Sequence, residues 1–134
     1  MELNVENNAN KKKILIIDDD LFFLAIAETM LSDEYDTLVA QSGQAALIIM
    51  VKQKPDLILL DIIMPEMDGW ETFRIIKGIT LLHEVPIAFL TSVSEEEGLE
   101  YAKSVGAVGY FSKPIKKEEI KIGIDKILKG EKLI

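Results

Sequence analysis

The sequence contains no cysteine and a single histidine, His83. The first absence excludes disulfides, thiolate zinc sites and thiol catalysis, and the second excludes a histidine-rich metal site and argues against a Ser-His-Asp triad. No apolar run is longer than the seven residues of Leu21–Ala27 or Ala45–Val51, whereas a membrane span needs about 18 or more. The first ten residues also lack the apolar core of a signal peptide. We therefore expect a cytoplasmic location.

Basic side chains are outnumbered by acidic ones: 15 Lys and Arg stand against 23 Asp and Glu, a net charge of −8. An acidic surface repels phosphate backbones, which argues against generic nucleic-acid binding. The length of 134 residues suits one domain, and an apolar share of 49% is enough to build a core without a metal or a disulfide. We expect a flexible leader at residues 1–11, one domain at 12–130 and a short C-terminal tail at 131–134.

Short apolar runs alternate with segments of helical period along the domain. The five runs suit buried parallel strands and cover Ile14–Ile17, Tyr35–Ala40, Asp56–Leu60, Pro86–Leu90 and Val108–Ser112. The five helical segments begin near Leu21, Ser42, Gly69, Ser94 and Lys116. This order of elements predicts an α/β fold in which helices cover both faces of a parallel sheet.

Two helical segments carry more specific expectations. In Leu21–Leu31 the spacing i, i+3, i+4, i+7 predicts a buried stripe of Phe23, Ile26, Ala27 and Met30. Asp20 stands where that helix would take its N-cap. The segment Lys113–Lys132 is rich in lysine. A solvated helix face is the usual explanation of such a run, and a partner-docking surface is the alternative.

Polar residues follow four of the five predicted strands at the carboxyl end, where ligands bind in open α/β sheets. These residues are Asp18, Asp19, Asp20, Asp61, Thr91 and Lys113. If the first and third strands are neighbours, Asp18, Asp19 and Asp61 meet, and like charges that close disfavour joint ionisation. A divalent cation removes the conflict, and an all-oxygen ligand set selects a hard ion, Mg²⁺ or Mn²⁺.

The same side chains suit phosphoryl transfer. Lys113 can neutralise one phosphoryl oxygen, the Thr91 hydroxyl can donate to another, and an aspartate can act as the nucleophile. Phosphoryl transfer depends mostly on positioning and on charge neutralisation. A metal, an ammonium and a hydroxyl around one carboxylate therefore form a plausible set of parts for this chemistry.

Four stretches resemble the receiver domains of bacterial two-component response regulators. They are ILIIDDD at residues 14–20, DLILLDIIMPEMDG at 56–69, AFLTS at 88–92 and GAVGYFSKPI at 106–115. The resemblance covers nearly the whole chain and implies a flavodoxin-like (βα)5 doubly wound parallel sheet with strand order 2-1-3-4-5. It also implies a single-domain regulator similar to the chemotaxis receivers. The chain ends at Ile134, soon after the last helix, so it is either a stand-alone regulator or a piece of a longer protein. The leading Met1 and the leader favour the stand-alone regulator.

The resemblance assigns roles to the polar residues. Asp61 would be the phosphoacceptor, and its donor would be a sensor histidine kinase or a histidine phosphotransfer protein. Asp18, Asp19, Asp61 and the backbone carbonyl of Ile63 would hold Mg²⁺, with Mn²⁺ as a possible substitute. Thr91 and Lys113 would bind the phosphoryl oxygens. Together with Asp61 they would be the catalytic residues.

The resemblance also implies a switch. Tyr110 would be the aromatic side chain that turns inward as the Thr91 hydroxyl moves toward the phosphate, and the Lys113–Pro114 bond would be cis. The face made by the fourth helix, the fifth strand and the fifth helix would then control a downstream protein, in a monomer or a phosphorylation-dependent homodimer. Such a chain is a signalling domain and not an enzyme, apart from intrinsic phosphotransfer and autodephosphorylation.

Two positions depart from the commoner pattern of the family. Ile63 and Val93, each two residues after a predicted site residue, are apolar here and often polar in relatives. We expect their branched side chains to hinder an attacking water and to lengthen the life of the acyl phosphate on Asp61.

Two other functions stay open from the sequence. A haloacid-dehalogenase-type phosphatase would use Asp18 as its nucleophile, but no strand after Lys113 ends in an acidic pair, and Asp61 would have no role. A receiver-like module could instead act by protein contact without phosphorylation. The presence of all five residues of the family's site argues against that alternative; they are Asp18, Asp19, Asp61, Thr91 and Lys113.

Overall fold

Five parallel strands form one sheet in the order β2-β1-β3-β4-β5, as the resemblance implies. The structure is a computed structural model that describes residues 11–92 and 96–134. Its strands are β1 (Lys13–Ile17), β2 (Asp36–Ala40), β3 (Leu57–Asp61), β4 (Ile87–Thr91) and β5 (Gly109–Ser112). Its helices are α2 (Leu21–Leu31), α3 (Gly43–Lys52), α4 (Gly69–Lys77), α5 (Glu96–Val105) and α6 (Lys117–Leu128). Residues 1–10 of the expected leader and Val93 lie outside the described residues.

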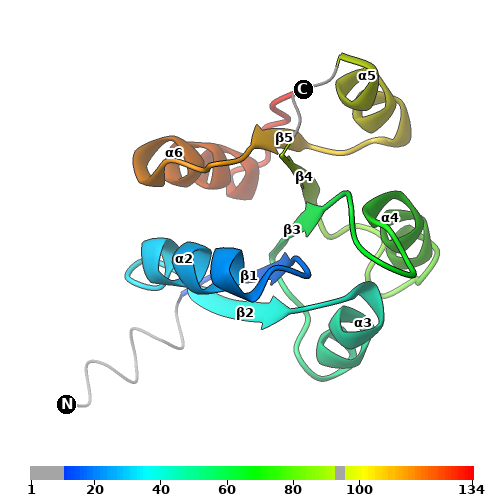
Figure 1. Cartoon of the computed structure of the whole chain (residues 1–134), viewed down its shortest axis with the longest axis horizontal. Coiled ribbons are helices and arrows are strands. Elements are labelled where there is room, and N and C mark those ends of the chain that lie inside the picture. The colour runs from blue at the N-terminus through cyan, green and yellow to red at the C-terminus, as the bar shows by residue number, and fades with distance from the viewer. Residues whose placement is uncertain (1–10, 93–95) are drawn as a thin grey trace.

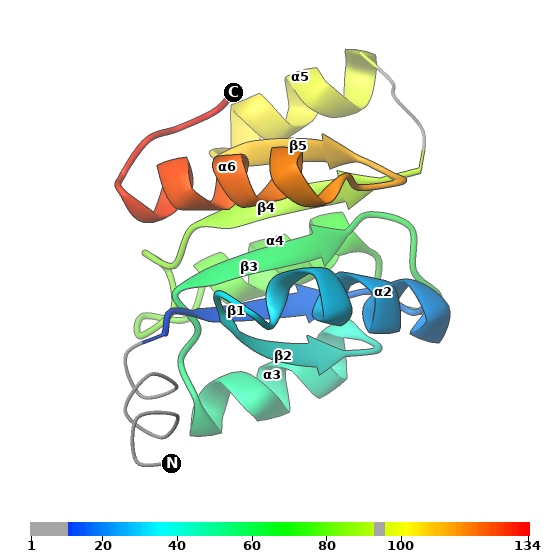
Figure 2. The ribbon, with the colours of Figure 1, turned by 90° about the vertical axis from the view of Figure 1, so that its left-hand side faces the viewer.

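The carboxyl ends of all five strands lie at one edge of the sheet. Ile17 at the end of β1 lies opposite Ala40 of β2 and Leu60 of β3, and Thr91 of β4 lies opposite Ser112 of β5. The strand arrows therefore point the same way in Figure 2. Helices α2 and α6 cover one face of the sheet, and α3, α4 and α5 cover the other (Figure 1). This is the predicted doubly wound arrangement.

Side chains of the central strands alternate between two apolar cores, one on each face of the sheet. The core under α3, α4 and α5 takes Leu15, Ile17, Ile58, Leu60 and Phe89 from the strands. The core under α2 and α6 takes Ile14, Ile16, Leu57, Leu59 and Leu90. Because both faces of these strands are buried, every position favours an apolar residue. The uninterrupted aliphatic runs in the sequence follow from this burial.

The buried face of α2 differs from the prediction. Leu24, Ala27 and Leu31 are its buried residues, and Ile26 is 41% exposed. Of the predicted stripe only Ala27 is fully buried, so that prediction is wrong by about one position. Apolar residues occur around almost the whole circumference of this helix, and periodicity alone does not select one face. Packing against the sheet and α6 selects it.

The lysine-rich C-terminal segment is not solvated throughout. Lys121 of α6 is only 8% exposed, and its ammonium pairs with the carboxylates of Asp33 (2.9 Å) and Glu34 (3.3 Å) between α2 and β2. The nearby hydroxyl of Tyr35 donates to Asp125 of α6 at 3.1 Å. The solvated-face interpretation is therefore wrong at Lys121, because tertiary contacts bring two carboxylates to it.

Polar side chains cap the helices that leave the carboxyl edge. Asp20 accepts hydrogen bonds from two backbone N–H groups of the first turn of α2, which confirms its predicted role. Ser42 and Asp68 cap α3 and α4 in the same way. Helix α4 ends at Lys77, and Gly78 closes it. Across residues 11–92 and 96–134, none of the helices combines the length and the apolar character that a bilayer crossing requires.

Candidate functional site

The three carboxylates that were predicted to meet lie together at the carboxyl edge of the sheet. Asp18 and Asp19 follow β1, and Asp61 is the last residue of β3. One oxygen of each carboxylate lies within 4.8 Å of the other two. Asp18 and Asp61 are 1% and 5% exposed, whereas Asp19 is exposed. The strand order explains the cluster, because it places β1 beside β3 and ends both strands at the same edge.

The carboxylate of Asp18 is held at both oxygens. Its Oδ1 accepts the backbone N–H of Asp20 at 2.9 Å, and its Oδ2 accepts the ammonium of Lys113. The backbone N–H of Asp18 donates to the carbonyl of Ala40 on β2 at 3.0 Å. These contacts fix the direction in which Asp18 points, so it is placed before any ligand arrives.

Lys113 lies between the two buried carboxylates. Its Nζ pairs with Asp18 and lies 3.3 Å from Oδ1 of Asp61. The ammonium also lies 4.4 Å from the ring centroid of Phe23 on α2, in a cation–π contact. Burial alone would lower the pKa of Lys113, but the hydrogen bond that it donates to Asp18 and the charge of Asp61 outweigh burial and raise the pKa. Lys113 therefore carries its positive charge at neutral pH.

Asp61 is the carboxylate whose ionisation is least favoured. Burial and then the charge of Asp18 raise its pKa to about 6, although Lys113 acts in the opposite direction. At neutral pH Asp61 is still mostly ionised, and three carboxylates then face one ammonium. The net charge of this group is −3 + 1 = −2, which a divalent cation would cancel. The donors are all oxygen atoms, and the cluster therefore fits a hard ion such as Mg²⁺.

Thr91 and Tyr110, the two residues of the predicted switch, lie on the neighbouring strands β4 and β5. Thr91 is the last residue of β4 and is buried, and its carbonyl accepts the backbone N–H of Lys113 at 2.7 Å. Tyr110 of β5 is half-buried and packs against the core beneath α5. Its hydroxyl lies so close to Gly98 of α5 that a Cβ there would be only 2.4 Å away. The hydroxyl of Tyr110 thus lies against α5, the helix that follows Thr91 in the chain.

The loop after Asp61 is shaped by a close backbone approach. A Cβ at Gly69 would lie 2.2 Å from the carbonyl oxygen of Asp61, so only glycine fits this position. The Gly69 N–H also donates to the carbonyl of Ile62 at 2.7 Å. In the same loop Ile63 is 66% exposed, and Glu66 has a φ of 67°. The Lys113–Pro114 peptide bond on the other side of the site is cis, as the resemblance implies.

Two contributors to the site were not identified from the sequence. Phe23 was assigned to a core stripe, yet its ring contacts the ammonium of Lys113 from 90 positions away in the chain. Gly69 was recognised only as the start of a helical segment. The Asp68-Gly69 pair does signal a turn, but nothing local shows that the carbonyl of Asp61 approaches it.

The chain matches a family model described as the response regulator receiver domain over residues 14–125. Sporulation initiation phosphotransferase F of Bacillus subtilis is 34% identical over 118 residues, which are 87% of this chain and 94% of that protein. A Vibrio cholerae protein named "Probable cyclic di-GMP phosphodiesterase" is 39% identical over 102 residues, which are 76% of this chain but 23% of that protein. The chain also spans about half of several transcriptional regulators that it matches.

Solved structures of receiver proteins also match the fold of this chain. The structure of Vibrio cholerae chemotaxis protein CheY4 matches with a TM-score of 0.82 at 28% identity, and the match covers 87% of this chain and 98% of that one. A CheY-like receiver domain protein of Methanospirillum hungatei matches with a TM-score of 0.80 at 26% identity, over 90% of this chain and 95% of that one. The chain belongs to the response regulator receiver domain family of two-component signalling systems.

Proposed function

We propose that this chain is a phosphorylation switch in which Asp61 is the phosphoacceptor. Receiver domains are signalling domains and not classical enzymes, and they interact with histidine kinases or phosphotransfer proteins and with downstream targets. The proposal rests on the position of Asp61, which is buried at a strand end beside two further carboxylates and the ammonium of Lys113. An ionised carboxylate in this position destabilises the fold. A role in phosphoryl transfer would explain why the chain has it.

The proposed ion site consists of Asp18, Asp19, Asp61 and the backbone carbonyl of Ile63. It would hold Mg²⁺, and Mn²⁺ suits the same oxygen donors. When bound, the ion supplies positive charge to the oxygens of the transferring phosphoryl group. The chain itself supplies the orientation, since Asp18 is fixed by Asp20 and Lys113 before an ion arrives.

The proposed reaction moves one phosphoryl group without an oxidant or a cofactor. A carboxylate oxygen of Asp61 forms a new P–O bond while the P–N bond of the donor phosphohistidine breaks. The leaving imidazole keeps the electron pair and takes a proton. The ammonium of Lys113, 3.3 Å from Asp61, and the hydroxyl of Thr91 would bind phosphoryl oxygens. Slow hydrolysis of the acyl phosphate would return the chain to its resting state.

The proposed output begins at Thr91 and Tyr110. Movement of the Thr91 hydroxyl toward the phosphate would make room for Tyr110, which already contacts α5 through Gly98. The changed surface would be the face formed by α5, β5 and α6, and its target a downstream protein. Partner binding and phosphorylation-dependent homodimerisation are both compatible with this face. The proposed phosphohistidine donors operate in the cytoplasm, and we place the chain there.

The proposal is tested by locating a covalent phosphate. The protein is incubated with Mg²⁺ and a small phosphodonor such as acetyl phosphate, and the acyl phosphate is reduced with borohydride before peptide mass mapping. We expect modification at Asp61, none in Asp61→Asn, and unchanged modification in Asp36→Asn. Asp36 is a matched control because it is a partly exposed carboxylate at the opposite end of the sheet. Phosphate on Asp18 would instead support the phosphatase alternative.

A second measurement separates the switch from a contact-only module. Beryllofluoride with Mg²⁺ imitates an aspartyl phosphate without a phosphodonor. In amide NMR spectra we expect it to shift the signals of Asp61, Thr91, Lys113 and Tyr110 together. An absence of any response at concentrations that saturate the Mg²⁺ site would overturn the proposal and favour the contact-only module.

A further inference from the structure

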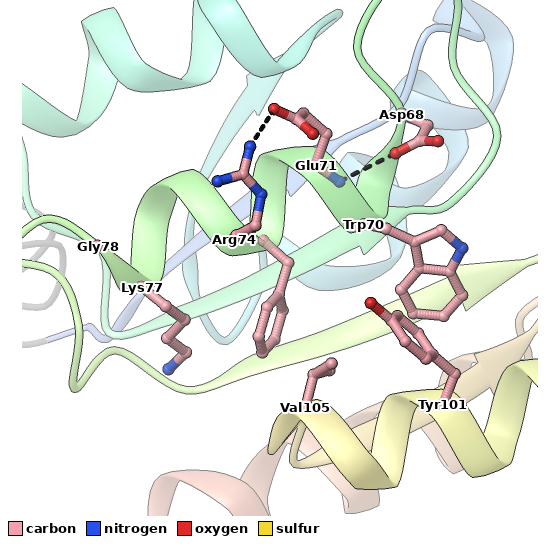
Figure 3. Close-up of a pocket in the computed structure, with 9 residues that line it drawn as sticks. Asp68, Trp70, Glu71, Arg74, Lys77, Gly78, Tyr101 and Val105 are labelled. Atoms are coloured by element: carbon pink, nitrogen blue, oxygen red, sulfur yellow. Dashed lines mark hydrogen bonds and ion pairs between the residues drawn. The ribbon is translucent and has the colours of Figure 1, made fainter.

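A pocket lies between α4 and α5, away from the carboxylates of the proposed phosphorylation site. Its volume is about 620 Å³, within the range of small-molecule sites. Figure 3 shows Trp70, Arg74 and Lys77 on α4, with Tyr101 and Val105 opposite them on α5. The sequence assigned no role to Trp70, which is the only tryptophan of the chain. The volume and the aromatic lining suit a small ligand.

The aromatic walls of this pocket are held in place by the core. The ring of Trp70 lies 4.6 Å from that of Phe89 and 4.7 Å, edge-on, from that of Tyr101. Phe73, which also lines the pocket, stacks on Phe89 at 5.3 Å. Phe89 is fully buried in β4. Since these rings are fixed by one another, a planar ligand would meet a surface that is already formed and would lose little by ordering it.

Most charged groups around the pocket already have hydrogen-bond or ion-pair partners. Asp68 caps α4 by accepting the backbone N–H of Glu71 at 2.9 Å, and the carboxylate of Glu71 pairs with Arg74. Both interactions are drawn in Figure 3. They leave no net charge on Glu71 and Arg74 together, so neither of these residues decides the sign of a ligand.

Lys77 is the only cationic residue lining this described pocket that has no carboxylate partner. Its ammonium donates to the carbonyls of His83 (3.0 Å) and Val85 (2.9 Å) and lies 5.6 Å from the ring centroid of Phe73. None of these partners carries a negative charge, and no carboxylate of the described residues pairs with Lys77. Burial accordingly lowers the pKa of Lys77. An anion at this end of the pocket would give the ammonium of Lys77 a negatively charged partner without displacing the two carbonyls.

The spacing along α4 sets the length of the ligand. Trp70 and Lys77 are seven residues apart, so they lie on one face of the helix and about 10 Å apart along its axis. We propose that the α4–α5 pocket binds a small planar aromatic anion of two rings, with the rings against Trp70 and Tyr101 and the acidic group at the ammonium of Lys77. The proposal does not depend on phosphorylation of Asp61.

The proposal is tested with 2-naphthoate and its neutral counterpart 2-naphthalenemethanol. Trp70 gives a single indole N–H signal in the amide NMR spectrum, and its shift reports binding in the pocket directly. We expect saturable shifts of this signal and of backbone signals in α4 and α5. We expect 2-naphthoate to bind about tenfold more tightly, which is the effect of one charge-assisted hydrogen bond. Equal affinities, or shifts that do not include the indole, would overturn the proposal.

Variants of the pocket identify the source of the preference. Lys77→Gln should remove the preference for 2-naphthoate and leave the affinity for the alcohol unchanged, whereas Lys77→Arg should retain the preference. Lys103→Gln removes a lysine of α5 whose ammonium pairs with Glu100, and it should leave both affinities unchanged. Val105→Phe should fill the pocket and weaken both probes. A preference that survives Lys77→Gln in a variant with an otherwise unchanged spectrum would overturn the assignment of the anion to Lys77.

Discussion

Two polar clusters of this molecule differ in charge balance, and the difference separates the proposed reactive site from a structural contact. At the carboxyl edge, three carboxylates surround the single ammonium of Lys113. Between α2 and α6, the carboxylates of Asp33 and Glu34 face the ammonium groups of Lys117 and Lys121. The first cluster has an excess of negative charge. The second is neutral in sum, so it needs no ligand to complete it.

The pKa values of the carboxyl groups move in opposite directions in the two clusters. Burial and the charge of Asp18 raise the pKa of Asp61 to about 6, whereas the hydrogen bond from Lys121 lowers the pKa of Asp33. A raised carboxyl pKa means that ionisation destabilises the fold, and a lowered one means that ionisation stabilises it. Ionised Asp61 thus lowers the stability at the carboxyl edge, whereas the ion pairs of the other cluster hold α6 to the segment between α2 and β2.

Lys113→Met in the absence of Mg²⁺ should give the largest loss of stability, because it removes the only positive charge of the first cluster. The buried carboxylates of Asp18 and Asp61 would then have no cationic partner, and we expect a loss of about 3 kcal/mol in the free energy of unfolding. Urea unfolding at neutral pH measures the change, and Mg²⁺ should restore part of it. Lys116→Met, at an exposed position, should change the free energy by less than about 0.5 kcal/mol. Equal effects of the two variants would contradict the claim that Lys113 balances the buried carboxylates.

Asp61→Asn should stabilise the protein without Mg²⁺, which is the opposite of the usual result for a buried polar substitution. The variant removes a charge that the fold disfavours, and we expect a gain of roughly 1 to 2 kcal/mol at neutral pH. The stabilisation that Mg²⁺ gives to the wild-type chain should shrink at the same time. Thermal unfolding with and without Mg²⁺ measures both effects. A loss of stability in both conditions would show that Asp61 is not an unfavourable charge.

The dependence of stability on pH should separate the same two clusters. The folded-state pKa of Asp61 is about 6 and lies above the ordinary value of 3.8 for an aspartate, so the contribution of this group to stability falls as the pH rises from about 4 to 6. The folded-state pKa of Asp33 lies below 3.8, so its contribution is present above that pH and is lost as the pH falls through the folded pKa. Asp61→Asn should flatten the first region of the profile and Asp33→Asn the second. The reverse pattern would refute the assignment.

Lys121→Met should destabilise the protein less than Lys113→Met does. Asp33 and Glu34 are each about half exposed, and water and salt therefore screen their charges after the lysine is removed. The loss should be greater in dilute buffer than in high salt. Lys126→Met, at an exposed position on the same helix, serves as the control. A loss as large as that of Lys113→Met would mean that charge balance does not distinguish the clusters.

The smallest effect on stability is expected from Ile63→Asn combined with Val93→Glu. Ile63 is 66% exposed beside the site, so its replacement should alter the free energy of unfolding by no more than about 0.5 kcal/mol. The rate at which the phosphorylated chain loses phosphate should nevertheless rise, because polar side chains admit and orient water better than branched aliphatic ones. Release of inorganic phosphate from the purified acyl phosphate measures this rate. An unchanged rate would show that the apolar side chains of Ile63 and Val93 do not lengthen the life of the acyl phosphate.

The parts of the molecule that were predicted correctly depend on short stretches of chain. Runs such as Ile14–Ile17 and the apolar stretch that ends at Asp61 are strands because both faces of a central strand are buried. The meeting of Asp18 with Asp61 follows once β1 and β3 are neighbours. The cap at Asp20 needs only the next two N–H groups. Each of these predictions rests on local pattern and on one rule about parallel sheets.

The failures involve residues whose partners lie far away in the chain. The buried face of α2, the ring of Phe23 beneath Lys113 and the burial of Lys121 all depend on how α2 and α6 pack together. A helix that is apolar on nearly every side, or a lysine in a lysine-rich run, carries no local sign of which neighbour it will meet.

Order along the chain is enough to establish the α/β class of this protein, its family and the residues of its acidic cluster, because these depend on burial periodicity and on residue types at strand ends. Packing in three dimensions establishes which charges are balanced and which are not. It also forms the pocket in which Trp70 faces Tyr101, and it leaves Lys77 there without a carboxylate. The physical reason is that electrostatic and aromatic interactions act through space, between side chains whose separation along the chain is arbitrary.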